Sequence, residues 1–185
     1  MNFNKSPALR PYLEYFPECG KRVYVDDAAA VIGRVRLGDD VSIWPGAIVR
    51  GDVNTIDIGA ATNIQDLAVL HVTHDGEFSP GGRHLELGVG ITVGHGAILH
   101  ACTIEDYCLI GMGAKLMDDV VVESHCLIAA GSLVAPGSRV ESGWLWRGVP
   151  ARPARILTAR EIEQLSYSAE HYVRLKNQYL AMTQQ

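Results

Sequence analysis

An aliphatic residue recurs at every sixth position through most of the chain, often with a glycine directly after it. The series runs through Leu37, Ile43, Val49, Ile58, Ile64, Leu70, Leu87, Val93, Leu99, Ile104, Ile110, Leu116, Val122, Ile128, Val134 and Val140, with one five-residue step and two longer interruptions. A helix needs a period near 3.6 and a single amphipathic strand a period of 2, so neither explains this spacing. A short strand and a turn, repeated many times with the aliphatic residue pointing inward, does explain it. A set of unrelated short strands would not keep this register.

Three such units make one triangular coil, and stacked coils lie about 4.8 Å apart. We therefore predict a single domain, 1–185, with a mainly β fold. Residues 1–30 form an irregular lead-in with a first strand, and residues 31–149 form a parallel β-helix of hexapeptide repeats. The long interruption between Leu70 and Leu87 contains an insertion that is rich in Gly, Pro, Asp and Ser, which predicts a protruding loop within residues 71–86.

The repeat ends where Pro150 and Pro153 appear, and a different periodicity follows. Thr158 with Glu161 three residues later is a capping box, which marks the start of a helix. Apolar residues then recur at helical spacing, namely at Ile162, Leu165, Ala169, Tyr172, Val173 and Leu180. We predict a C-terminal α-helix over 158–181 that packs along the β-helix, and we favour packing over a partner site for its apolar stripe.

Composition narrows the class of protein. The net charge is −5 and no run of Lys or Arg is present, which argues against nucleic acid as a partner. The N-terminus lacks the apolar core of a signal peptide, and no apolar run is long enough to span a bilayer. The four cysteines have no metal-finger spacing. These features predict a soluble cytoplasmic protein that has no membrane association.

Two histidines fall at equivalent places on neighbouring coils. His71 and His100 each follow an inward aliphatic residue, and they are 29 residues apart, which leaves one coil of 18 once the eleven-residue insertion is removed. Their imidazoles can therefore converge on one metal ion. His95 lies on another face, so a neighbouring chain would have to supply it. Three faces and three chains then suggest a closed threefold ring.

Three neutral imidazoles with one open position form the ligand set of a catalytic zinc that activates water. Polar edge residues without a metal are the alternative. Gln65 follows inward Ile64 and is a candidate to hydrogen-bond the bound water or the substrate. Arg50, Asp52 and Asp66 are candidates for a charge network that orients Gln65 or links subunits, and a purely structural interface salt bridge is the alternative for them.

Several segments, together covering nearly the whole chain, closely resemble the γ-class carbonic anhydrase-like proteins. They are IWPGAIVRGDVN, TNIQDLAVLHVTH, TVGHGAILHACTIED, IGMGA, SGWLWRGVPARPAR and YSAEHYV. The resemblance implies a left-handed β-helix, a homotrimer, and Zn²⁺ (or Fe²⁺ or Co²⁺) at the subunit interface. It places the metal ligands at His71, His95 and His100, supporting residues at Arg50, Asp52, Gln65 and Asp66, and Tyr167 near the site. The implied activity is reversible hydration of CO2 to bicarbonate by a zinc-bound hydroxide.

The sequence departs from the family pattern at particular positions. Leu67 replaces a usual glycine, Ala61 replaces a frequent arginine, and Val53 replaces a glutamate of strongly active members. The acidic loop after the first histidine ligand is also short. Without that glutamate, the proton shuttle is expected among His74, Glu77 and His84. A non-catalytic or weakly active metal-binding trimer is the alternative function. A hexapeptide acyltransferase that uses coenzyme A is less favoured, and metal-hydroxide hydrolysis of another small carbonyl substrate is a further alternative.

Overall fold

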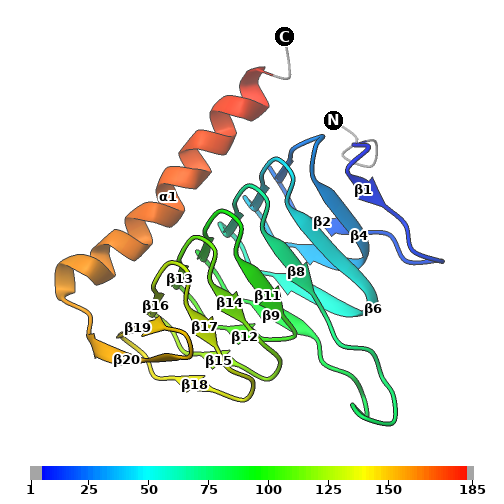
Figure 1. The fold of residues 1–185 in the computed structure, drawn as a ribbon. Helices are drawn as coiled ribbons and strands as arrows, with labels where there is room; N and C mark the ends of the chain where they lie inside the picture. The colour runs from blue at the N-terminus through cyan, green and yellow to red at the C-terminus, as the bar shows by residue number, and fades with distance from the viewer. Residues whose placement is uncertain (1–5, 183–185) are drawn as a thin grey trace.

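A computed structural model describes residues 6–182 and contains a left-handed β-helix with one long helix beside it (Figure 1). Its strands belong to two sheets. The eight-stranded sheet contains β3 (Tyr24–Val25), β5 (Ser42–Ile43), β7 (Asn63–Ile64), β10 (Thr92–Val93), β13 (Leu109–Ile110), β16 (Leu127–Ile128), β19 (Trp144–Gly148) and β20 (Ala151–Ile156). Neighbouring coils pair in parallel, apart from the terminal β19–β20 hairpin.

The twelve-stranded sheet makes the other two sides of the triangle, because β4 and β6 are long enough to turn a corner. Its strands are β1 (Leu9–Arg10), β2 (Glu18–Cys19), β4 (Ala30–Leu37), β6 (Ile48–Ile58), β8 (Val69–His71), β9 (Leu85–Leu87), β11 (Ile98–His100), β12 (Thr103–Ile104), β14 (Lys115–Leu116), β15 (Val121–Val122), β17 (Leu133–Val134) and β18 (Arg139–Val140). One side continues through β8, β11, β14 and β17, and the other through β9, β12, β15 and β18.

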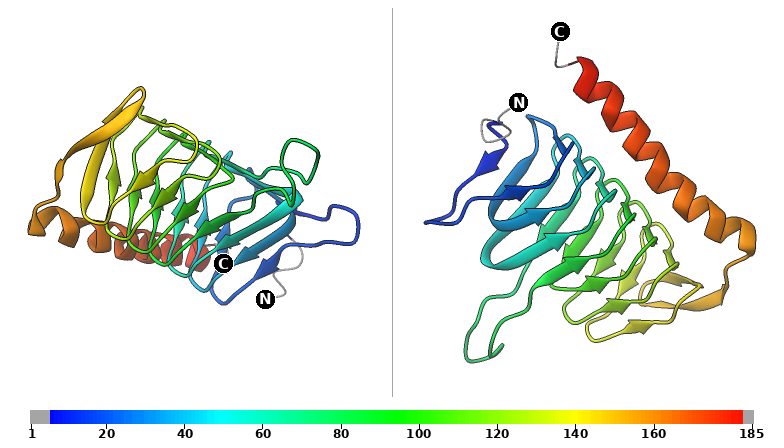
Figure 2. Two further views of the ribbon diagram at one scale, coloured as in Figure 1. Left: turned by 90° about the horizontal axis from the view of Figure 1, so that it is seen from below. Right: turned by 180° about the vertical axis from the view of Figure 1, so that it is seen from behind.

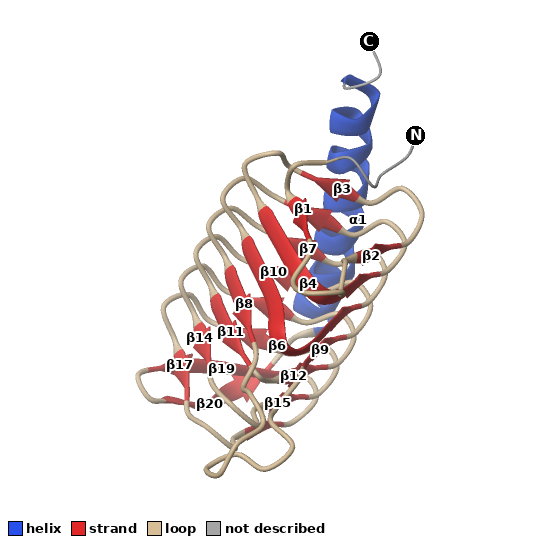
Figure 3. Ribbon diagram, turned by 90° about the vertical axis from the view of Figure 1, so that its right-hand side faces the viewer, coloured by secondary structure: helices blue, strands red, loops and turns tan. Residues whose placement is uncertain are grey.

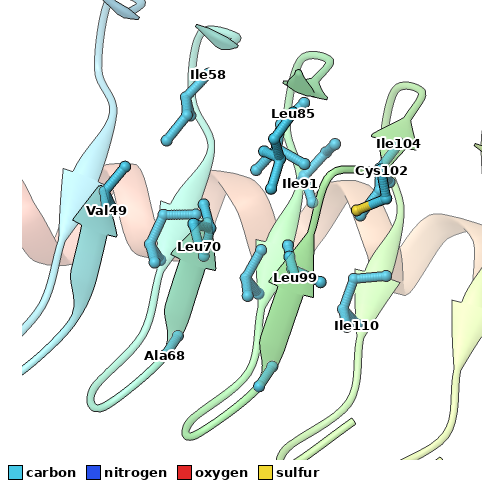
Figure 4. Close-up of a cluster of buried hydrophobic side chains, with 14 of the residues drawn as sticks. Val49, Ile58, Ala68, Leu70, Leu85, Ile91, Leu99, Cys102, Ile104 and Ile110 are labelled. Atoms are coloured by element: carbon cyan, nitrogen blue, oxygen red, sulfur yellow. The ribbon is translucent and has the colours of Figure 1, made fainter. Parts of the chain in front are cut away.

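The core is the column of aliphatic residues that the six-residue period predicts. Every residue of the series from Leu37 to Val140 is buried, and inward residues on successive coils stack upon one another (Figure 4). Val49, Leu70 and Leu99 occupy one such column, since they pair directly in register. The predicted β-helix of hexapeptide repeats is therefore confirmed.

The two ends of the β-helix differ from the prediction. Residues 6–30 contain three short strands and the start of a fourth, where a single first strand was expected. Cys19, Val25 and Val31 continue the six-residue spacing backwards from Leu37, so the coil begins earlier than residue 31. At the other end the β19–β20 hairpin extends to Ile156, beyond the expected end near Val149.

The C-terminal helix α1 (Ala159–Met182) follows the predicted bounds closely. The capping box forms, because the Thr158 backbone N–H donates to Glu161 at 2.8 Å and the Glu161 N–H donates to the Thr158 hydroxyl at 3.3 Å. The helix contacts β3, β5, β7 and β10, and Leu165 and Ala169 are buried against them. No helix among residues 6–182 combines the length and hydrophobicity that crossing a lipid bilayer requires.

The three sides of the triangle carry different outward side chains. The helix-covered face, built from the eight-stranded sheet, lies under α1 (Figures 1 and 3). The charged face presents a column of mostly ionisable residues, namely Glu18, Arg36, Asp57, Glu86, Thr103, Val121 and Arg139. The apolar face presents Ala30, Ile48, Val69, Ile98, Lys115 and Leu133. Among residues 6–182 no helix covers the apolar face.

Candidate metal centre

One edge of the apolar face carries a ladder of polar side chains. Arg50 pairs in register with His71, and His71 with His100, because all three follow an inward aliphatic residue on adjacent coils. Side chains alternate between the two sides of a strand, so these three point outward. The rings of His71 and His100 have centroids 5.2 Å apart. The structure therefore brings together the two histidines that the 18-residue spacing pairs.

Each of these histidines is held by a carboxylate from its own chain. His71 Nε2 lies 3.2 Å from Asp52 Oδ1, and His100 Nδ1 lies 2.9 Å from Asp118 Oδ2. An ionised carboxylate only accepts hydrogen bonds, so both of these ring nitrogens must donate. In neutral imidazoles the remaining nitrogens, His71 Nδ1 and His100 Nε2, then carry lone pairs.

These two nitrogens face each other across 3.2 Å. With both rings neutral their lone pairs repel at this distance, and a cation between them makes the arrangement favourable. Zinc–nitrogen bonds of about 2.0–2.1 Å in a tetrahedral site place two ligand nitrogens about 3.3 Å apart. The pair therefore fits two adjacent positions of a tetrahedral metal ion, and carboxylates that hold metal-binding imidazoles in this way are common in such sites.

Burial and nearby charges shift the pKa values of His71 and of the two carboxylates. Burial, with the nearby positive charge of Arg50, lowers the pKa of His71, which favours the neutral ring. Partial burial acts to raise the pKa of Asp118, but hydrogen bonds from Thr73 and His100 outweigh it and hold that pKa below its ordinary value. The pKa of Asp52 is also lowered, since Arg50 and His71 oppose the same effect of burial. These shifts favour ionised carboxylates at Asp52 and Asp118 and a neutral ring at His71.

Asp118 and Thr73 are functional candidates that the reasoning from sequence missed. Thr73 donates a hydrogen bond to Asp118, which also accepts from His100. Asp118 lies 18 residues after His100, but β11 and β14 pair at an offset of 17 residues, Leu99 with Leu116, so Met117 is the position equivalent to His100 and Asp118 follows it. The repeat spacing alone therefore does not point to Asp118, and its contact with His100 depends on side-chain direction.

His95 occupies the other end of the same face. It lies in the turn before β11, whereas His100 ends that strand, so the length of β11 separates the two. Its Nδ1 is 2.9 Å from Asp66 Oδ2, and its side chain is 48% exposed, compared with 20% for His71. Within residues 6–182 of one chain, no three His, Cys, Asp or Glu side chains gather into a metal site. Within one chain the candidate ligands therefore form two separate groups, the histidine pair (His71 and His100) and His95, which we call the two half-sites.

Gln65 lies with His95 and not with the histidine pair. It is buried, and its amide donates to Asn63 Oδ1 at 3.2 Å. With His95 it lines a largely apolar cavity of about 410 Å³ between the eight-stranded sheet and α1, to which Ser168 and Tyr172 also contribute. No side-chain hydrogen bond or ion pair among the described residues joins Gln65 to Arg50, Asp52 or Asp66. The expected charge network is thus divided between the two half-sites of a chain.

The insertion follows β8, which ends at His71, and protrudes from the β-helix (Figure 2). Its ends are held by the Thr73–Asp118 hydrogen bond and by Arg83 Nε, which donates to Asp119 at 2.7 Å. His74 and Glu77 line a cavity of about 360 Å³ that also includes Asp118. By contrast, His84 lies 3.7 Å from Glu86, outside that cavity. Two of the three candidate shuttle residues therefore share a cavity with the residue that holds His100.

Tyr167 contacts other residues of the helix. It is 61% exposed and stacks on His171 at a centroid distance of 6.3 Å. Arg174 lies over its ring at 5.5 Å. Tyr167 is therefore not brought to the histidine pair within one chain.

Comparison with known proteins agrees with this architecture. The family model for the bacterial transferase hexapeptide (six repeats) matches residues 101–136. The chain is 49% identical to the protein YrdA of Escherichia coli over 95% of both chains. It is 34% identical to a carbonic anhydrase of Geobacillus kaustophilus, covering 96% of this chain and 93% of that one. It is also 47% identical to mitochondrial gamma carbonic anhydrase 2 of Arabidopsis thaliana, covering 94% of this chain and 58% of the relative.

The chain belongs to the γ-class carbonic anhydrase-like family. The hexapeptide model describes only the repeat, so its name assigns no transferase activity to this member of the γ-class family. Val53, which departs from the family pattern, is 36% exposed directly after Asp52. The side chain at this position therefore offers no proton acceptor at the edge where the histidine pair lies.

Proposed function

We propose that the protein is a metal-dependent carbonic anhydrase-like lyase that hydrates CO2 reversibly at sites between subunits of a homotrimer. The observation that carries the proposal is the close approach of His71 Nδ1 and His100 Nε2, at a separation suited to a tetrahedral metal, with each ring held by a carboxylate. Family membership supports the reaction. The alternative acyltransferase function leaves this histidine pair without a role.

The shape of the chain supports the assembly. The apolar face has the histidine pair at one edge and His95 at the other. Packing the face of one copy against the next in a head-to-tail manner brings these edges together, and a ring of three closes such an interface. Each junction then gathers His71 and His100 from one subunit with His95 from its neighbour, and the uncovered column of Ile48, Val69 and Ile98 is removed from water.

Three imidazoles with an open fourth position suit Zn²⁺, with Fe²⁺ and Co²⁺ as alternatives. Such an ion, when bound, would lower the pKa of its water to about 7 and would supply the nucleophile for CO2. The protein's own residues prepare the site. Asp52 and Asp118 hold two rings with their lone pairs outward, and Asp66 holds the third. Gln65, fixed by Asn63 beside His95, places its amide where it can orient the substrate or bicarbonate.

Regeneration of the site requires transfer of a proton to solvent. His74 and Glu77 are the stronger candidates, since both line the cavity that includes Asp118, whereas His84 is turned to Glu86. We expect the His74→Ala/Glu77→Gln double variant to slow CO2 hydration in weakly buffered solution and to recover when buffer is added. His84→Ala is the matched control, and equal rates for the parent and the double variant would rule out this route.

The test of the proposed function is metal content per chain after anaerobic purification, together with stopped-flow CO2 hydration. We expect about one metal per chain and clear hydration in the parent, and loss of both in His71→Ala. The His84→Ala variant should keep both, because that side chain lies outside the half-sites. Metal without hydration would support the non-catalytic metal-binding trimer. The exposed Val53 is consistent with that alternative, because it offers no proton acceptor. Absence of metal from the parent would overturn the site.

A further inference from the structure

One corner of the β-helix, between the helix-covered face and the apolar face, repeats the same left-handed turn on successive coils. The residue with positive φ is three places after an inward aliphatic residue each time. The values are 71° at Gly46, 62° at Leu67, 65° at Gly96, 67° at Gly113 and 68° at Gly131. Glycine adopts this conformation without a steric penalty, whereas a side chain raises its free energy. Leu67 is the exception in this column of five.

Lack of space does not explain why three of the other four coils use glycine. A Cβ atom at Gly96, Gly113 or Gly131 would meet no atom within 4 Å. Conversely, burial within the subunit does not account for Leu67, because its side chain is 69% exposed. The side chain lies over Gly46, where an added Cβ would be 2.7 Å from Leu67 Cδ2. Leu67 thus has an unfavourable backbone conformation, and its large apolar side chain remains mostly exposed to water.

The position of Leu67 indicates what compensates for this penalty. It directly follows Asp66, the carboxylate 2.9 Å from His95, and it stands at the edge of the uncovered apolar face. In the proposed ring this edge meets the histidine-pair edge of a second copy. There Val53, 36% exposed, directly follows Asp52, which holds His71, and offers an apolar surface.

We propose that Leu67 is an assembly residue, whose side chain is buried against a second copy of this chain beside the shared metal site. The inference rests on the proposed function for its partner surface. It assigns to Leu67 a role that the metal ligands do not have: it strengthens the junction between subunits without touching the metal. Removal of the apolar side chain should therefore weaken the assembly, whereas relief of the turn conformation should stabilise the subunit itself.

Sedimentation velocity over a dilution series tests this inference. Leu67→Gly and Leu67→Asn both suit a left-handed turn and remove the apolar side chain, so each should raise the concentration at which the assembly half-dissociates by about 10-fold or more. Leu67→Met keeps an apolar side chain and should stay within about 3-fold of the parent. Gly131→Leu, at the same corner far from His95, should lower the urea midpoint of unfolding without tightening the assembly.

Unchanged dissociation in both Leu67→Gly and Leu67→Asn would overturn the inference, as would a parent that is monomeric throughout. Metal content measured on the same samples separates this result from the proposed function. Weakened assembly in the two variants supports the role of Leu67 even if the parent carries no metal, an outcome in which the proposed metal site alone fails. Loss of metal from Leu67→Gly at concentrations where it is fully assembled would contradict a role confined to subunit contact.

Discussion

Two faces of the β-helix carry mostly apolar outward side chains, and α1 covers only one of these faces. On the helix-covered face, Trp44 packs against Tyr172 and Tyr179 of α1, with ring centroids 5.7 and 5.1 Å apart. On the apolar face, Ile48, Val69 and Ile98 are aligned and partly exposed, and no helix among residues 6–182 covers them. The two half-sites lie at the edges of the face without a cover, which is where a second copy would complete them.

The largest effect should come from a charge at the centre of the apolar face. Ile98→Asp would bury an unpaired carboxylate at each junction, which typically costs ~3–5 kcal/mol, so we expect dissociation into subunits and loss of metal. Light scattering with metal analysis measures both. Val121→Asp is the matched control, since Val121 points outward on the charged face next to Arg139. A fully assembled Ile98→Asp protein would show that this face is not the interface.

A smaller effect is expected from the carboxylate that holds His100. Asp118→Asn removes the charge that fixes the ring, and loss of such a partner lowers metal affinity by about 10–100-fold. Competition with a chelator measures the affinity, and the assembly should persist because Asp118 is not on the apolar column. Asp119→Asn is the neighbouring control, as Asp119 pairs with Arg83. Equal metal affinities in the two variants would show that Asp118 does not support the metal site.

A substitution on the helix-covered face should change only the free energy of unfolding. Lys176 of α1 is fully buried, and its Nζ lies 2.8 Å from Asp40 Oδ1. Because Asp40 also has Arg22 as a partner, Lys176→Met should lower the free energy of unfolding by about 1–3 kcal/mol. Metal content and assembly should not change. Arg174→Met, on the exposed side of the helix, is the control and should stay within about 0.5 kcal/mol of the parent.

The smallest effect concerns pH and the start of α1. Hydrogen bonds from Arg155 and from Thr158 lower the pKa of Glu161 from 4.5 to about 2. A depressed folded-state pKa adds stability that is present above the unfolded value and is lost as the pH falls through the folded one. Urea unfolding followed by circular dichroism at about pH 5 and about pH 2 should therefore show a smaller loss of stability for Glu161→Gln than for the parent. Glu163→Gln should behave like the parent.

The sequence predicts the repeat well because one physical constraint acts at every coil. The inward residue must be apolar, so the spacing of Ile58, Ile64 and their equivalents is enough to locate the successive sides of the solenoid. The pairing of His71 with His100 follows from the same arithmetic. The capping box at Thr158 is a local signal, and it predicts the start of α1 correctly.

Other features depend on contacts that the period does not encode. The first coil is hard to detect because Cys19 and Val25 continue the spacing without the aliphatic–glycine pattern seen later. Lys176 lies on the buried stripe of α1, where a charged residue is unexpected until Asp40 is seen beneath it. The tethering of His100 by Asp118 depends on side-chain direction, and the separation of Gln65 from the histidine pair depends on which corner each residue occupies.

The central claim is that one metal site needs residues from two chains, and mixing complementary variants tests it most directly. His95→Ala and His71→Ala/His100→Ala chains should each bind little metal alone. When equal amounts are dissociated and reassembled together, random assortment in a threefold ring leaves about a quarter of the junctions with all three ligands, so about a quarter of the parental metal content should return. Failure of the mixture to recover metal, or full metal binding by His95→Ala alone, would contradict a site shared between chains.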